Sequence, residues 1–223
     1  MPTRAENRRE IESQIVRLGR DHLRTHGAAG LSLRAIARDL GMVSSAVYRY
    51  VANRDDLLTL LLVQGYTDLA DTVDTALSGT GNARAQLVAT ATAVRTWAIG
   101  DPARWALLYG SPVPGYQAPA DQTSVPGTRV VGRILEILSA VTHAPETDQR
   151  GYAALTADFD TIRDQFDVHV DDALLARGIA FWSTMIGAVS LEVFGQYGTD
   201  TLRDPTALFD AVIADAADRV VGD

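Results

Sequence analysis

The residues Ser32 to Tyr50 read SLRAIARDLGMVSSAVYRY, and their apolar spacing predicts two short helices that are joined at one glycine. Gly41 lies where a tight turn needs a residue that tolerates a positive φ angle. The spacing of Ala37, Gly41 and Val47 is that of a helix-turn-helix. In that motif the alanine permits close crossing, the glycine turns the chain and the valine fills the joint.

Two serines are placed to begin these helices. Ser32 is expected to cap the first helix and Ser44 the second, since a hydroxyl at that position accepts a hydrogen bond from a free backbone N–H. A second helix held in this way projects from the protein body and can enter the DNA major groove. The stretch therefore predicts a sequence-specific DNA-binding domain.

The charge distribution agrees with this prediction, although the net charge of −8 alone argues against nucleic acid. Residues 1–54 hold ten Arg and five acidic residues, a balance of +5, whereas residues 55–223 hold ten Arg and 23 acidic residues, a balance of −13. A basic N-terminal part on an acidic body is typical of a protein that meets phosphate at one end.

Composition excludes several other classes. The chain has no cysteine, so it has neither a disulfide framework nor a thiolate metal site. The N-terminus lacks an apolar signal core, and the weakly charged stretch 178–191 is too short to span a bilayer. We therefore expect a cytoplasmic protein, with 178–191 in a buried helix.

Helical periodicity continues through the rest of the chain and predicts an all-α fold. Asn53 is expected to cap a long helix that ends near Leu77. The other helices are expected at residues 4–25, 82–100, 102–109, 127–142, 149–165, 171–197 and 205–220, with a proline-rich loop over 111–126. We predict a three-helix DNA-binding domain at residues 1–53 and a helical domain for ligand binding and dimerisation at 54–223.

Residues 10 to 62 resemble the TetR family of bacterial transcriptional regulators. The resemblance rests on GLSLRAIA from Gly30, LGM from Leu40, VYRYV from Val47, and the following Asn53-Arg54 and Leu57-Leu58. It implies an all-helical homodimer that binds a palindromic operator, holds a small apolar or aromatic ligand in its C-terminal domain and is released from DNA by that ligand.

The resemblance also assigns DNA contacts. Tyr48 and Arg54 match positions that hold phosphate, and Arg34 matches one that contacts phosphate or a base. Arg49 is the best candidate for reading a base, because bidentate Arg–guanine pairing is the commonest specific contact. The full predicted set is Arg34, Ser44, Ser45, Ala46, Tyr48, Arg49, Tyr50 and Arg54. Arg4, Arg8 and Arg9 form either an arm that touches DNA or a solvated tail.

Two further sets belong to the C-terminal half. Aromatic side chains there are either plain core or the lining of an apolar pocket, and the predicted pocket residues are Trp97, Trp105, Tyr109 and Phe166. Small residues recur along the most apolar helix and permit close approach of a second helix. The predicted dimer interface is Trp182, Ser183, Ile186, Gly187, Val189 and Ser190.

Other functions have less support. His22 and His26 have a metal-compatible spacing, but no carboxylate completes a motif, so His22 is expected to pack on the apolar face of the first helix. No phosphate loop, nucleophile elbow or cofactor fingerprint is present. We expect neither metal nor cofactor. The alternatives to a ligand-released repressor are a helical enzyme with a vestigial DNA-binding head and an activator that needs no ligand.

Overall fold

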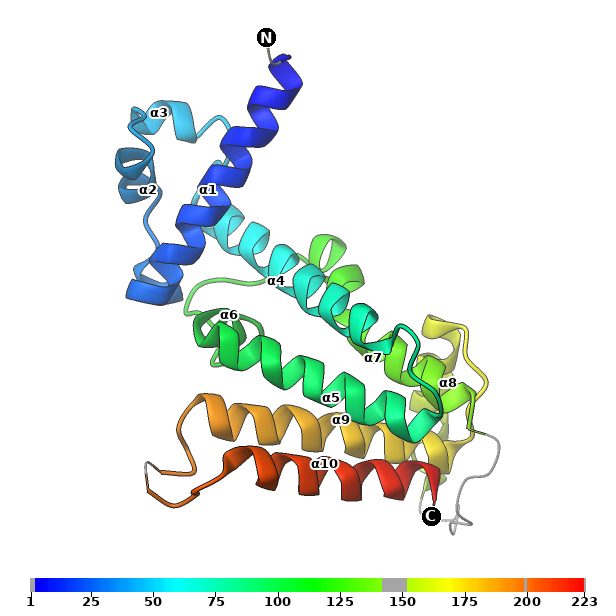
Figure 1. The fold of residues 1–223 in the computed structure, drawn as a ribbon. Coiled ribbons are helices and arrows are strands. Elements are labelled where there is room, and N and C mark those ends of the chain that lie inside the picture. The colour runs from blue at the N-terminus through cyan, green and yellow to red at the C-terminus, as the bar shows by residue number, and fades with distance from the viewer. Residues whose placement is uncertain (1–2, 142–151, 199, 223) are drawn as a thin grey trace. The chain divides into compact units, whose positions relative to one another are not determined.

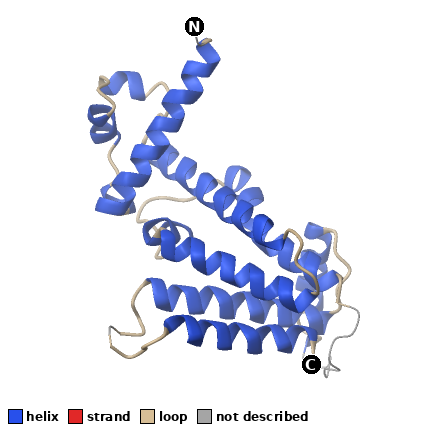
Figure 2. Cartoon of the chain, viewed as in Figure 1, coloured by secondary structure: helices blue, strands red, loops and turns tan. Residues whose placement is uncertain are grey.

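The computed structural model describes residues 3–141, 152–198 and 200–222, and all regular elements in these ranges are helical (Figures 1 and 2). The all-α prediction is therefore confirmed. In chain order the helices are α1 (Arg4–His26), a 3₁₀ turn (Ala28–Gly30), α2 (Leu33–Asp39), α3 (Ser44–Val47), α4 (Arg54–Leu77), α5 (Ala83–Gly100), α6 (Pro102–Tyr109), α7 (Ala120–Ser139), α8 (Thr156–Phe166), α9 (Asp172–Val193) and α10 (Pro205–Val221).

The helices form two compact units whose border differs from the predicted one between residues 53 and 54. The first unit contains residues 1–68 and 101–127, and the second contains 69–100 and 128–223. The helix-turn-helix thus shares its unit with residues 54–68 of α4 and with α6. The reason is that α6 packs on α1, a long-range contact that sequence periodicity does not reveal.

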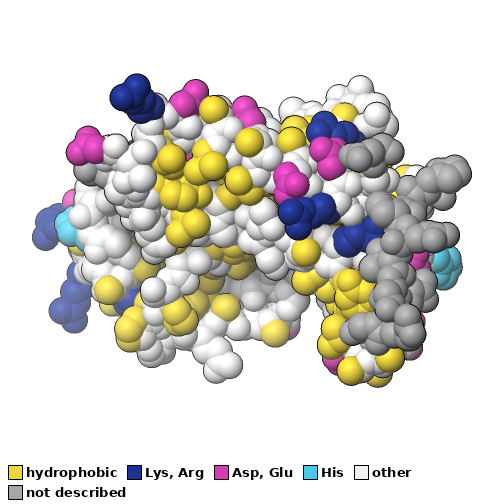
Figure 3. Space-filling model, turned by 90° about the horizontal axis from the view of Figure 1, so that it is seen from below, with side chains coloured by type: hydrophobic (Ala, Val, Ile, Leu, Met, Phe, Trp, Pro, Cys, Tyr) yellow, Lys and Arg dark blue, Asp and Glu magenta, His cyan; other side chains and the backbone are white. Residues whose placement is uncertain are grey.

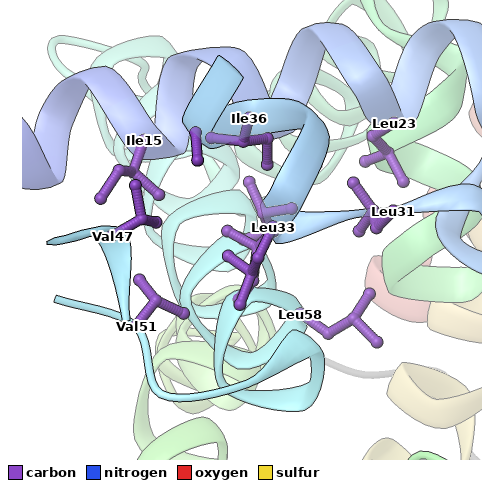
Figure 4. Close-up of a cluster of buried hydrophobic side chains, with 11 residues drawn as sticks. Ile15, Leu23, Leu31, Leu33, Ile36, Val47, Val51 and Leu58 are labelled. Carbon is purple, nitrogen blue, oxygen red and sulfur yellow. The ribbon is translucent and has the colours of Figure 1, made fainter. Parts of the chain in front are cut away.

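The core of the first unit is the junction of α1 to α4, as the motif predicts. Ile15 and Ile36 are fully buried, and Val47 reaches the same cluster from α3 (Figure 4). Ala37 is buried where the helices cross, and Gly41 adopts φ +67° in the turn. Each large side chain removed from water here contributes about 1.5–3 kcal/mol, so this small core holds α3 in a fixed orientation.

The two predicted caps of the motif have different outcomes. Ser32 caps α2, with its Oγ accepting from the backbone N–H of Ala35. The prediction that Ser44 caps the next helix is wrong, because Ser44 is already its first residue. Val43 occupies the capping position and its side chain makes no capping bond.

The start of α4 is capped as predicted. Asn53 Oδ1 accepts from the N–H of Asp56 at 2.9 Å, and Asp55 and Asp56 place negative charge in the first turn. We expect Asn53→Ala to lower the free energy of unfolding by about 1 kcal/mol. Asn53→Ser keeps an acceptor and should lose less. Urea unfolding of both variants measures this difference, and equal losses would show that the cap is unimportant.

One predicted loop is partly a helix. Residues 111–126 were expected to form a loop because they hold four prolines, but α7 begins at Ala120 and includes Pro126. Pro126 lies in the second turn of an otherwise amphipathic helix, where the packing of the following turns outweighs one missing N–H donor. The predicted helix ends at Thr142 and Gln149 lie outside the described residues.

In the second unit α9 packs against α10 and α5, and α8 also contacts α9. By length and composition α9 could cross a membrane, but apolar core helices pass the same test. Buried residues such as Phe181 and Met185 assign it to the core of this unit. Arg133 and Arg129 of α7 bind Asp74 of α4 and hold the pKa of that carboxyl below its usual value.

Candidate DNA-binding and ligand-binding sites

The candidate DNA-reading surface is the outer face of residues 44–50, which comprise α3 and the turn that follows it and are called the α3 segment below. Ser45, Tyr48 and Arg49 are exposed, whereas Val47 between them is buried. Residues three and four positions apart lie on one side of a helix, so these three side chains share a face that points away from the core. Ser44 and Ala46 are half-buried beside that face.

Arg34 supplies an exposed guanidinium from the first turn of α2. Tyr50 is different, because its ring packs against the helix-turn-helix core and is half-buried. The guanidinium carbon of Arg8 lies 5.5 Å from the centre of that ring, a cation–π contact. This contact brings α1 beside the end of the α3 segment.

The N-terminal arginines Arg4, Arg8 and Arg9 belong to helix α1 rather than to a separate arm or tail. Thr3 and Glu6 make a reciprocal capping box at the start of α1, and the bonds from Thr3 lower the pKa of Glu6. Arg4 and Arg9 are exposed on the first turns of this helix. The basic N-terminus is thus an ordered helical extension.

Arg54 has a partner inside the protein. Its Nη2 donates to the carbonyl of Ala28 at 2.8 Å, which ties the start of α4 to the turn after α1. Its Nη1 lies 3.6 Å from Asp55 Oδ1, and about a third of the side chain is exposed. Arg54 is therefore placed to position the motif, a role beyond the predicted phosphate contact.

We expect Arg54→Ala to lower the free energy of unfolding by about 1–2 kcal/mol, because the Ala28 carbonyl loses a charged donor. DNA affinity should fall by a similar factor on every sequence. Urea unfolding and binding to operator and random DNA test this. A loss of affinity without any loss of stability would leave phosphate contact as its only role.

His22 also joins two helices of the first unit. Its Nε2 lies 2.7 Å from Asp39 Oδ2, so it links α1 to the end of α2. The side chain is largely covered, as predicted, but its hydrogen bond with Asp39 was not foreseen. Among the described residues no group of His, Asp and Glu has the arrangement of a metal site.

A partly buried charge cluster joins α1, α4 and α6, and sequence analysis missed it. Asp68 Oδ2 accepts from Arg20 Nη2 at 2.7 Å and from Arg104 Nη2 at 2.5 Å. Arg104 is 8% exposed, a rare position for a charged residue. No local pattern could have paired these residues, because they are 36 to 48 positions apart.

Three of the four predicted pocket residues line neither of the two hollows described below. Trp105 is fully buried, with its ring centre 4.4 Å from that of Tyr109, and Tyr109 meets Tyr66 edge-on at 6.2 Å. These rings pack on one another inside the first unit, and burial raises the pKa of Tyr109. Trp97 on α5 is half-buried and is not among the lining of the two hollows described next.

Phe166 does line a cavity, together with Trp182 of the predicted dimer interface. This cavity lies between α7, α8 and α9, has a volume of about 120 Å³ and is almost entirely apolar. Its lining is Val131, Ile134, Leu135, Ile162, Phe166, Leu175, Gly178, Ile179 and Trp182. Its volume is below that of ordinary ligand sites, roughly 300–1,000 Å³.

A larger hollow, the α4–α5 groove, has a volume of about 760 Å³. Its lining is Thr72, Thr75, Ala76, Arg84, Ala85, Val88, Ala89, Thr92, Ala93 and Thr96. The hydroxyls of Thr75, Thr92 and Thr96 donate to carbonyls of their own helices four residues earlier. Because these polar atoms are already bonded, the groove presents mainly methyl groups.

The predicted dimer residues lie on α9, and five of the six are at least partly exposed in the single chain. Val189 is fully buried within the unit, so it does not belong to that surface. A Cβ placed on Gly187 would meet no atom within 4 Å, so this side of α9 is open in the single chain. Seen from the side of α10, hydrophobic side chains gather between scattered charges (Figure 3).

Comparison with known proteins agrees with this architecture. Residues 87–216 match the family described as tetracyclin repressor-like, C-terminal domain. An HTH-type transcriptional regulator of Mycobacterium tuberculosis, Rv1816, is 54% identical over 213 residues, which cover 93% of this chain and 91% of the relative. A relative from Mycobacterium bovis, Mb1846, has the same identity and coverage.

Solved structures extend the match to the whole fold. The regulatory protein SCO4313 superposes with a TM-score of 0.81 and is 33% identical, with 96% of this chain and 98% of that chain covered. A TetR-family regulator from Shewanella sp. PV-4 shares the fold alone, with a TM-score of 0.59, 15% identity and coverage of 93% and 96%. The chain therefore belongs to the TetR family of DNA-binding transcriptional regulators.

Proposed function

We propose that this regulator is a homodimeric repressor that reads a palindromic operator through α3 and is released by an elongated apolar ligand. The observation that carries the DNA part is the exposed face of Ser45, Tyr48 and Arg49 over a buried valine. Arg49 would pair with guanine in the major groove, while Tyr48, Arg34 and the half-buried Ser44 and Ala46 lie against the backbone and groove wall.

The α4–α5 groove supports the ligand part of the proposal. Its volume is in the range of small-molecule sites, and its surface is methyl-rich. The α5 residues from Arg84 to Thr96 extend over about 18 Å at 1.5 Å per residue. A ligand that follows this side would have a long hydrocarbon body. Arg84, which pairs with Asp218, lies at one end of the groove and would face a polar head group of the ligand.

A homologous series of saturated fatty acids tests the ligand. Members long enough to fill the groove should release operator DNA, with a coupling free energy of about 1–3 kcal/mol. Ala89→Trp should abolish release and keep operator binding, because the added ring fills the groove. Ala157→Trp on the exposed side of α8 is the control. If every member leaves the operator complex intact, this ligand class is wrong.

The open side of α9 supports the dimer. The predicted residues Trp182, Ser183, Ile186, Gly187 and Ser190 would contact the same surface of a second copy across a two-fold axis. Sedimentation should give twice the 24.0 kDa of one chain. Gly187→Leu should yield a folded monomer, since the added side chain meets open space within one chain. A dimer for this variant would place the interface elsewhere.

Repression itself is measured by transcription from the operator-bearing promoter. Added protein should lower transcript levels, and the releasing ligand should restore them. Higher transcript levels with added protein would favour the activator alternative instead.

A further inference from the structure

Val43 stands out in the reading segment as an exposed hydrophobic side chain with no role in the single chain. It is 71% exposed, and the only more exposed large hydrophobic residue in the described ranges is Val125 at 76%. The preceding residue, Met42, packs against the helix-turn-helix core, but Val43 does not belong to that cluster. Packing within the protein therefore does not account for it.

Capping does not account for Val43 either. It occupies the position before the first residue of α3, with φ −67° and ψ 140°, where Ser, Thr, Asn or Asp would accept a backbone N–H. The valine side chain accepts nothing, and only its carbonyl is used, by Ala46 at 2.9 Å. In the free protein, serine or threonine would suit this site better, because its hydroxyl would cap α3 and would be a polar group in contact with water.

The location of Val43 suggests what covers it. It directly precedes the face that carries Ser45, Tyr48 and Arg49, so it is continuous with the surface that meets the major groove. Apolar side chains in that groove have one matching partner, the C5-methyl group of thymine. Val43 cannot bind phosphate instead, because that contact needs a hydrogen-bond donor and the valine side chain has none.

We propose that Val43 is a specificity-determining residue that packs against a thymine methyl group in each operator half-site. The proposal rests on α3 as the reading helix. Burial of one methyl group is worth roughly a four-fold change in affinity, so Val43 would favour thymine over cytosine or uracil at one position. Arg49 and Val43 would then read neighbouring base pairs through different chemistry.

The test compares Val43→Ser with the wild type on an operator recovered by selection of bound genomic fragments. Each thymine of one half-site is replaced in turn by deoxyuridine, which removes only the methyl group. We expect one position at which the wild type loses about four-fold in affinity and Val43→Ser loses nothing. Val43→Ser itself should bind the unmodified operator about four- to fifteen-fold more weakly, with random DNA unaffected.

Stability provides the second readout. Serine can cap α3, so the melting temperature of Val43→Ser should stay the same or rise while its operator affinity falls. A residue with a purely structural role would move both in the same direction. Val125→Ser is the matched control and should change neither.

The proposal is overturned if no thymine shows a methyl effect that depends on Val43, or if Val43→Ser binds the operator as tightly as the wild type. Failure of the DNA-reading role of α3 has a separate signature. In that case the wild type itself would bind no genomic fragment better than random DNA.

Discussion

Arg49→Ala is expected to remove most of the preference for operator over random DNA. A bidentate Arg–guanine pair is worth about 1–3 kcal/mol, and a dimer loses one pair in each half-site. Operator affinity should therefore fall by at least about 30-fold, while affinity for random DNA changes little. Fluorescence anisotropy at one fixed salt concentration measures both, because phosphate contacts make every affinity salt-dependent.

Arg219→Ala is the matched control for Arg49→Ala. Arg219 is another exposed arginine, with 76% of its side chain accessible, but it lies on α10 in the other unit. It should leave both affinities unchanged. Equal losses on operator and random DNA for Arg49→Ala would assign Arg49 to the phosphate backbone and leave base reading to other residues.

Asp68→Ala is expected to have the largest effect on stability. It leaves the guanidinium groups of Arg20 and Arg104 close together without their shared carboxylate. Removal of one partner from a buried ion cluster costs about 3–5 kcal/mol. Because 38% of the Asp68 side chain is exposed and water screens it, we expect a loss of about 2–3 kcal/mol, measured by urea unfolding.

A double-mutant cycle separates the charge cluster from simple packing. In an Arg104→Met background, Asp68→Ala should cost clearly less, since one of the two facing cations is gone. Asp215→Ala, which breaks an exposed pair with Arg219, should cost no more than about 0.5 kcal/mol. A loss that stays the same in the Arg104→Met background would show that Asp68 and Arg104 are not coupled.

The cluster also bears on how ligand and DNA binding are linked. Asp68 is the last residue of α4 that belongs to the first unit, and Arg104 is on α6 in the same unit. It fixes α4 and α6 to α1, the helix that supports the reading motif. In the proposed repressor, a variant that loosens this junction should weaken operator binding even without ligand.

Local patterns predicted what depends on neighbours in sequence. Ala37, Gly41 and Val47 gave the helix-turn-helix, and Asn53 gave the start of α4, because turns and caps are set by residues a few positions apart. The prediction that Ser44 is a capping residue was wrong because α3 begins one residue earlier than expected, with Val43 at the capping position. The expectation that prolines mark a loop was also wrong for α7, where tertiary packing outweighs the backbone N–H donor that Pro126 lacks.

Features that depend on distant residues were not predicted. The Asp68 cluster and the packing of Trp105 on Tyr109 beside Tyr66 bring together three helices, and their composition gives no local signal. For the same reason the aromatic residues proposed from the sequence as a pocket lining do not line the α4–α5 groove. The α4–α5 groove is lined mainly by alanines and threonines, which carry no sequence signal for a ligand site.

The most direct test of the central claim is binding of the full chain to its selected operator over a range of salt concentrations. We predict a discrete complex of one dimer on two half-sites about one DNA turn apart, roughly 34–36 Å. Its affinity should fall steeply as salt rises, and Arg49→Ala should reduce the operator affinity to near that for random DNA. Operator binding by Arg49→Ala that equals that of the wild type would contradict the assignment of α3 as the reading helix.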